Sequence, residues 1–330
     1  MKKTSLLIAV MCALIGCRQI NNDLIVKGCI DGLQQGDTLF LTSFLLPDWE
    51  EGTIDTCYVD KSGEFNMVKA LEHTTFFLFA HAPKDTARIE SCIQGASILA
   101  KPSDVIEVQG SIYAIGALEK KGGFYNDPLV ARLDSMENVF SLNLIHIFNK
   151  AMEAQRSEQE DSIQKYQQAY NSARKSEELK ELNRYIAHEI NDSEYAAYLY
   201  LSRLYDVTAT QLEERFDNFS LEVKESYMGK RLYTMLKVLK NIEPGNTPSE
   251  FLVKDMHGNA VRLSDYRGKY LLIYNWGLCP GTMWVHPKIL KLYEQYHDKG
   301  FEVLGFTAND FFNTYEKLKT DSEIEPLFNH

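Results

Sequence analysis

The sequence predicts a multidomain α+β protein with an N-terminal β-sandwich-like domain, a helical middle region and a C-terminal α/β domain. Three observations lead to this prediction. Short runs rich in β-branched and aromatic residues follow one another between Asp23 and Gly116. From Leu129 to Asn241 the chain has almost no glycine or proline and is rich in Glu, Gln, Lys and Ala. After Pro248, apolar strand-like runs alternate with helical patterns.

The composition is that of a globular protein long enough for two or three domains. Of 330 residues, 45% are hydrophobic and 12% aromatic. The chain is acidic, with 35 Lys and Arg against 46 Asp and Glu, and it has no basic cluster. An acidic surface repels phosphates, so a nucleic-acid partner is not expected.

The N-terminal stretch "MKKTSLLIAVMCALIGC" has the organisation of an export signal. Lys2 and Lys3 form a positive segment, and Ser5–Ile15 is an apolar run too short to span a bilayer. The stretch ends in "LIGC", which resembles the lipobox of bacterial lipoproteins. The resemblance implies removal of residues 1–16 and acylation of Cys17; an ordinary cleaved signal is the alternative. Arg18 favours a lipid anchor in the outer membrane, facing the periplasm, by the sorting rules of that family.

Six cysteines are present. Cys12 lies in the signal and Cys17 is the lipidation site; the others are Cys29, Cys57, Cys92 and Cys279. Their wide, irregular spacing predicts no metal site. Cys29 and Cys57 lie in strand-like runs of an exported chain, so a disulfide between them remains open. We expect them instead to be small buried apolar residues.

The β-rich domain is expected over residues 17–126. Its predicted strands are 24–30, 37–44, 53–59, 64–71, 75–82, 97–100 and 104–110, separated by turn sequences. Many short strands at regular spacing indicate a sandwich or a barrel. His73 and His81 are isolated, and we expect both at the rim or the surface.

The helical region is expected over residues 127–243, where apolar residues recur every three or four positions. Asp192 or Ser193 is a suitable N-cap for a helix over 193–205, and Ser220 for one over 221–242. The stripes of Tyr and Leu in these helices are expected to form a core.

The C-terminal domain follows a linker, "NIEPGNTPSEF", with three Pro and Gly residues close together. The pattern predicts a β-hairpin over 251–265, a strand over 269–276, a helix over 280–300, a second strand over 301–307 and a second helix over 309–319. Both strands are apolar enough to be buried. A strand–helix–strand order favours a parallel pair.

Residues 249–312 closely resemble the first half of thioredoxin-like domains in exported, membrane-anchored (TlpA-like) thiol–disulfide oxidoreductases and the related AhpC/TSA group. The segments "LSDYRGKYLLIYNW" and "LYEQYHDKGFEVLGF" carry the resemblance, with Cys279 at a helix start and Pro287 eight residues later. The β-rich region resembles the domain of unknown function that precedes such domains, through "VKGCIDGLQQGDTLFL" and "GGFYNDPLVARL".

The sequence departs from that family twice. The motif Cys-x-x-Cys is Cys279-Pro280-Gly281-Thr282 here, so the second cysteine is replaced. The resemblance also ends before the cis-proline loop and the last strands and helix. We therefore expect an incomplete thioredoxin-like domain over 249–330, whose central strand, Tyr270–Trp276, has an open apolar edge.

Cys279 and Thr282 are the predicted catalytic residues. A thiolate is the reactive form of cysteine, and unpaired N–H groups at a helix start favour it. Pro280 suits the first helical position, and the Thr282 hydroxyl can donate to the sulfur. Trp276 can shield the sulfur, and His286 can face the same side of the helix.

A lone thiolate cannot release itself from a mixed disulfide, so dithiol cycling is not expected. Two chemistries remain: mixed-disulfide exchange with an external thiol or disulfide partner protein, and peroxide reduction through a sulfenic acid. The stretch "LLIYNWGLCPGT…LYEQYHDKGFEVLGFTANDF" also resembles glutathione peroxidases, in which a lone cysteine precedes a threonine by three. Asp310 stands where that family has a glutamine. The alternative is a redox-inactive lipoprotein that binds a partner or acts as a scaffold. Neither reading implies a cofactor.

Overall fold

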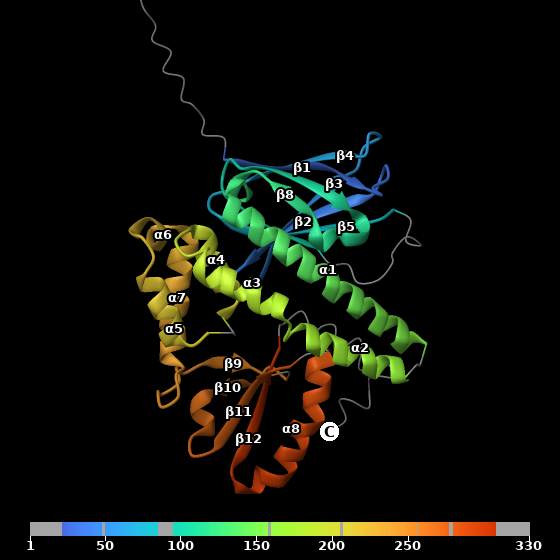
Figure 1. Ribbon diagram of the computed structural model, residues 1–330. Helices are drawn as coiled ribbons and strands as arrows, with labels where there is room; N and C mark the ends of the chain where they lie inside the picture. The colour runs from blue at the N-terminus through green and yellow to red at the C-terminus, as the bar shows by residue number, and fades with distance from the viewer. Residues whose placement is uncertain are drawn as a thin grey trace, which may run out of the picture. The chain divides into compact units, whose positions relative to one another are not determined.

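The computed structural model describes residues 22–47, 50–84, 95–157, 160–204, 207–255, 257–276 and 280–307. The chain divides into two compact units, one that ends at Glu243 and one that begins at Pro244 (Figure 1). The predicted order of a β-rich region, a helical region and an α/β region is confirmed. No helix among the described residues is both long and apolar enough to cross a membrane.

The β-rich region consists of two four-stranded sheets, so the predicted sandwich-like arrangement is confirmed. One sheet has the order β4-β1-β7-β8 and the other the order β3-β2-β5-β6. The strands are β1 (Asp23–Asp31), β2 (Thr38–Leu45), β3 (Glu50–Tyr58), β4 (Glu64–Ala70), β5 (Thr75–Ala82), β6 (Ala96–Ala100), β7 (Val105–Ser111) and β8 (Glu119–Lys121). The short strand β8 is not among the strands that the sequence predicts. It pairs antiparallel with β7, while β1 and β7 are parallel.

The core of the sandwich follows from the two-residue alternation of its strands. Leu24 and Val26 of β1 have no exposed surface, and Ile25 between them is half-buried. The Phe65 ring of β4 stacks on the Phe79 ring of β5, with centroids 5.5 Å apart. Because β4 and β5 belong to different sheets, this stack joins the two layers.

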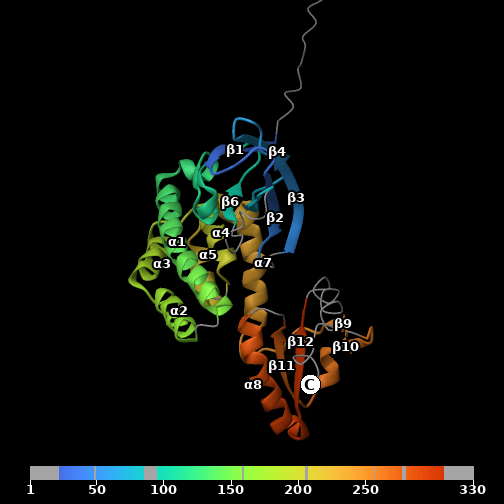
Figure 2. The same cartoon turned by 90° about the vertical axis from the view of Figure 1, so that its right-hand side faces the viewer.

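The helices gather to one side of the two sheets (Figure 2). They are α1 (Pro128–Arg156), α2 (Glu160–Ala173), α3 (Glu177–His188), α4 (Glu194–Ser202), α5 (Ala209–Asp217), α6 (Leu221–Glu225) and α7 (Tyr227–Asn241). The Phe76 ring of β5 stacks on Tyr198 of α4, with centroids 5.6 Å apart. The outer face of this sheet is therefore covered by helix, and β5 is buried on both faces.

The predicted helix over 221–242 is wrong in one respect, because the structure has two helices there. Ser220 caps α6 as expected, but Ser226 interrupts the helix and caps α7 through its side chain. The following turn passes so close to α6 that a Cβ on Gly229 would meet the Val223 carbonyl oxygen at 1.9 Å. Ser193 is the N-cap of α4, in agreement with the prediction.

The expectation that His81 lies at the rim is wrong. His81 shares the inward face of β5 with Phe77 and Phe79 and is 9% exposed. Its Nε2 lies 3.1 Å from Oδ2 of Asp37, which has no exposed surface. The Asp37 carboxylate also accepts hydrogen bonds from the Gln34 and Lys84 backbone N–H groups, at 2.9 and 3.0 Å. His73 is exposed, as expected.

Cys29 and Cys57 are free thiols in the structure. Cys29 is exposed, contrary to the expectation of burial, because the alternation of β1 places it on the face opposite Leu24 and Val26. Cys57 is half-buried and packs against the core. Cys12, Cys17 and Cys92 lie outside the described residues.

The second unit begins with an antiparallel hairpin of β9 (Leu252–Lys254) and β10 (Ala260–Arg262). β11 (Tyr270–Asn275), α8 (Pro280–Tyr296) and β12 (Phe301–Phe306) follow, and β11 and β12 are parallel as predicted. The burial expected for these strands is wrong for β11 within the described part of the chain: Tyr270 is 79% exposed and Ile273 48%. These two residues lie three positions apart and so on opposite faces of the strand, and the described residues cover neither face fully. The helix predicted over 309–319 lies outside the described residues.

The Asp37 carboxylate is predicted to be a main stabilising group of the sandwich. Replacing Asp37 by Ala removes three hydrogen bonds and leaves buried donors without partners, so we expect a loss of about 3 kcal/mol in unfolding free energy. The shift in the urea midpoint, followed by circular dichroism, measures this loss. Asp31→Ala is the matched control, because Asp31 is exposed at the end of β1. Equal effects of the two substitutions would contradict the assignment.

Candidate active site

The predicted reactive segment joins β11 to α8 in the second unit. In a parallel strand–helix–strand unit, the carboxyl end of the strand and the start of the helix lie at the same edge of the sheet. The helix begins at Pro280, where the sequence predicts it. Cys279 lies outside the described residues, as do the side chains of Pro280 and Thr282. The flanking residues Tyr274, Trp276 and His286 are described.

Trp276 directly follows β11 and continues its pairing with β12. Its backbone N–H donates to the Phe306 carbonyl oxygen at 2.7 Å. A Cβ on Gly305 of β12 would lie 3.4 Å from the Trp276 Cβ and 3.4 Å from the Tyr274 ring. The absence of a side chain at Gly305 therefore gives both aromatic residues room beside β12.

His286 is held by a residue that the sequence analysis did not single out. The Tyr274 hydroxyl and His286 Nδ1 are 3.0 Å apart and share a hydrogen bond. Their rings are 6.4 Å apart and tilted by 31°. Burial raises the pKa of the Tyr274 hydroxyl above its ordinary value.

This hydrogen bond orients α8 relative to β11. His286 lies seven residues after Cys279, which is close to two helical turns. Tyr274 therefore holds the face of α8 that carries His286 against the strand. A signal for Tyr274 exists in the sequence, since it lies two residues before Trp276 and so shares a strand face with it.

The described residues offer no group of three His, Cys, Asp or Glu side chains that can hold a metal ion. The buried pair of Asp37 and His81 belongs to the first unit, where backbone N–H groups occupy both oxygens of the carboxylate. These contacts indicate that the pair stabilises the fold. The segment around Cys279 therefore remains the candidate for thiol chemistry.

The hydrogen bond between Tyr274 and His286 is predicted to stabilise the second unit locally. We expect Tyr274→Phe to accelerate amide hydrogen exchange in β11 and α8 about fivefold, because about 1 kcal/mol of local stability is lost. Mass spectrometry of the exchanged peptides measures this change. Tyr270→Phe is the control, because that ring is 79% exposed. Unchanged exchange in Tyr274→Phe would contradict the role of this bond.

The same tyrosine predicts a dependence on pH. Its pKa is raised in the folded unit, so the folded form holds the proton more tightly than the unfolded form. The resulting stabilisation is complete below the ordinary tyrosine pKa of 10.0 and is lost as pH rises beyond it. Exchange in β11 should therefore accelerate less between neutral and strongly alkaline pH in Tyr274→Phe than in the unsubstituted chain, after correction for the intrinsic rate.

Part of the second unit is similar in sequence to known proteins. Residues 249–329 match the glutathione peroxidase family. A probable phospholipid hydroperoxide glutathione peroxidase of Mesembryanthemum crystallinum is 52% identical over 65 residues, which is 19% of this chain and 38% of that protein. A glutathione peroxidase homolog of Neisseria meningitidis serogroup B is 47% identical over 62 residues, 19% of this chain and 35% of that protein.

A third relative is the probable phospholipid hydroperoxide glutathione peroxidase 6, mitochondrial, of Arabidopsis thaliana, 46% identical over 76 residues. The match covers 23% of this chain and 32% of that protein. The chain thus spans about a third of the length of these relatives. Residues 249–329 are a glutathione peroxidase-family domain of thioredoxin-like fold, which follows a β-rich and a helical region in this chain.

Proposed function

We propose that this protein is a thiol peroxidase that reduces hydroperoxides with Cys279. The similarity of residues 249–329 to glutathione peroxidases is the observation that carries the proposal. Of the three relatives described above, two are named as probable phospholipid hydroperoxide glutathione peroxidases. A redox role is consistent with the family match and with the names of these two relatives.

The proposed reaction needs one thiolate. The Cys279 thiolate attacks the terminal oxygen of ROOH, the O–O bond breaks, and Cys279 becomes a sulfenic acid; the alkoxide RO⁻ leaves and becomes ROH with the proton that the thiol released on ionisation. An external thiol then displaces water and forms a mixed disulfide. A second external thiol releases Cys279 as the thiol and leaves as the oxidised disulfide. This route needs no second cysteine at position 282, where the chain has threonine.

The residues around Cys279 support its reactivity. Because α8 begins at Pro280, a thiolate at position 279 meets the N–H groups of the first helical turn. These groups and the helix dipole stabilise the anion and lower its pKa. In the proposal Thr282 donates its hydroxyl to the sulfur, and Trp276 limits the access of water.

Replacement of Cys279 tests the proposal. We expect Cys279→Ser in the full chain to lose hydroperoxide consumption, because the sulfur that becomes oxidised is gone. Cys57→Ser is the matched control, since Cys57 is half-buried in the other unit. Peroxide and external thiol consumption are measured together, and a 1,3-diketone trap followed by mass spectrometry should label Cys279 alone. Thiol exchange without peroxide consumption would favour mixed-disulfide exchange, and neither activity would favour a redox-inactive binding module.

The proposed location is a lipid anchor at Cys17. The signal-like segment 1–16 and the sequence "LIGC" support it. Several acyl chains on one residue give stable membrane attachment, whereas one chain binds weakly. An anchored peroxidase is close to membrane lipids, so we propose lipid hydroperoxides as its substrates, with faster turnover of phosphatidylcholine hydroperoxide in vesicles than of hydrogen peroxide.

Labelling with radioactive palmitate in an expressing bacterium tests the anchor. We expect Cys17→Ser to lose the label and to leave the membrane fraction, because the acylated sulfur is removed. Cys12→Ser is the matched control, since Cys12 lies in the segment that is cleaved away in this proposal. A label that persists in Cys17→Ser would refute lipidation at this position.

A further inference from the structure

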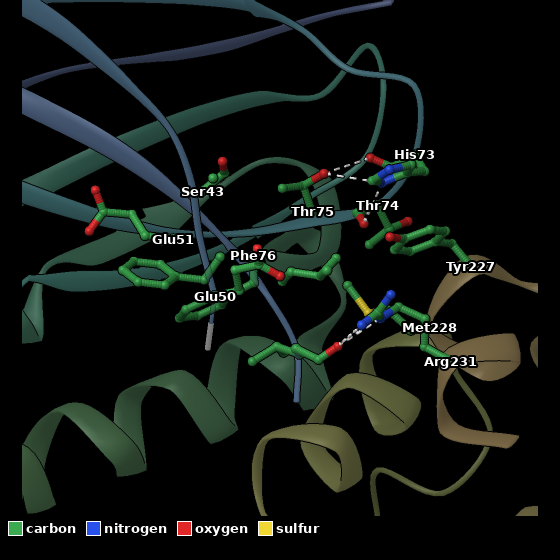
Figure 3. Close-up of a pocket in the computed structure, with 14 residues that line it drawn as sticks. Ser43, Glu50, Glu51, His73, Thr74, Thr75, Phe76, Tyr227, Met228 and Arg231 are labelled. Atoms are coloured by element: carbon green, nitrogen blue, oxygen red, sulfur yellow. Dashed lines mark hydrogen bonds between the residues drawn. The ribbon is translucent and has the colours of Figure 1, made fainter. Parts of the chain in front are cut away.

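The first unit contains a pocket of about 290 Å³ between strands β2 and β3 and the start of α7 (Figure 3). All of its lining residues belong to this unit. Its volume is at the lower end of the range of ligand sites in proteins, which suits a small molecule.

A β-bulge shapes one wall of the pocket. The pairing of β2 with β3 shifts between Thr42 and Phe44: β3 has two residues there, Gly52 and Thr53, opposite Ser43 alone, so the extra residue is on β3. The Ser43 hydroxyl accepts the Thr53 backbone N–H at 2.9 Å and holds the bulge in place. A Cβ on Gly52 would lie 2.5 Å from this hydroxyl oxygen, so the glycine permits the close approach.

The floor of the pocket is apolar. Leu46, Phe76 and Met228 line it and are each 2% exposed. They come from β5, from α7 and from the residue that follows β2, and they belong to the continuous core of the unit. An apolar part of a ligand can therefore be buried here without displacing any polar contact.

Arg231 of α7 provides positive charge at one side of the pocket. Its Nε and Nη2 donate to the Leu46 carbonyl oxygen, the Nε at 2.7 Å. A guanidinium carries five N–H donors, so three remain for a ligand once these two are used. The guanidinium carbon lies 6.0 Å from the centre of the Tyr227 ring, and that ring is itself stacked on His73. The side chain is thus oriented before any ligand binds.

Glu50 and Glu51 of β3 provide negative charge. Both carboxylates are exposed and line the pocket. Figure 3 shows Glu51 and Arg231 on opposite sides of it. Among the residues that the structure describes, neither glutamate forms an ion pair, and Arg231 is paired with no carboxylate. The pocket therefore holds opposite charges that do not neutralise each other directly.

We propose that this pocket binds a small zwitterion whose two charges are separated by an apolar chain, of the type of an ω-amino acid. The ligand carboxylate takes the remaining N–H donors of Arg231, in the fork geometry that guanidinium and carboxylate share. Its ammonium faces Glu50 and Glu51, and its apolar part covers Phe76 and Met228. A ligand with a single charge leaves either Arg231 or the two glutamates without a partner. The pocket should therefore bind ligands that carry both charges more tightly than ligands that carry one.

Isothermal titration calorimetry of the full chain tests this proposal with four probes. L-leucine and 6-aminohexanoate carry both charges, while hexylamine and hexanoate each carry one. We expect the better zwitterion to bind about tenfold more tightly than either single-charge compound, because one charged hydrogen bond is worth about that factor. The double variant Glu50→Gln/Glu51→Gln should bind the zwitterion about tenfold more weakly and hexanoate no more weakly than before.

Two further variants separate binding from folding. Arg231→Lys keeps the charge but loses the fork, and we expect weaker binding of the zwitterion with an unchanged circular dichroism spectrum. Glu64→Gln is the matched control, because Glu64 is an exposed glutamate on β4 outside the pocket. Failure of both zwitterions to bind below about 10 mM, or binding that the double variant leaves unchanged, would overturn the proposal. Hexanoate that binds as tightly as the better zwitterion would also overturn it.

Discussion

Strand β5 is buried on both faces, and the first unit depends on this burial. On one face Phe79 stacks on Phe65 of the other sheet, and on the opposite face Phe76 stacks on Tyr198 of α4. Aromatic side chains bury more apolar surface than any other type, so these two contacts tie three layers together. The sandwich and the helices thus form one compact unit, and the arginine of α7 reaches the end of β2 because α7 is held there.

Much of this architecture could be predicted from the sequence because the strands alternate regularly and turn residues separate them. The exceptions have local causes. β8 has only three residues and two lysines, so nothing in its composition indicates a strand; it forms because β7 offers an edge. His81 is buried although histidine is usually a surface residue, because its alternation with Phe77 and Phe79 places it on the inward face of β5. The break at Ser226 depends on the close packing of Gly229 against α6. The spacing of apolar residues in the sequence does not predict this contact.

Some features of the candidate site could likewise be predicted from the sequence, and others could not. The position of the helix start at Pro280 could be predicted, because a strand, a short connection and a proline at the first turn leave few alternatives. The partner of His286 could not, since Tyr274 lies twelve residues earlier on a different element. The pocket of the first unit could not be predicted from the sequence either. Its walls combine residues 43–52 and 73–76 with residues 227–231, which lie more than 150 residues later in the chain.

The parallel pairing of β1 with β7 has a consequence for how the chain acquires its fold. β1 lies between β4 and β7, so the first strand to be synthesised is also among the last to gain both neighbours. Its second neighbour ends only at Ser111, and contacts so distant in sequence are slow to form because a long loop must close first. The nascent sandwich therefore carries an apolar, half-paired strand until that point.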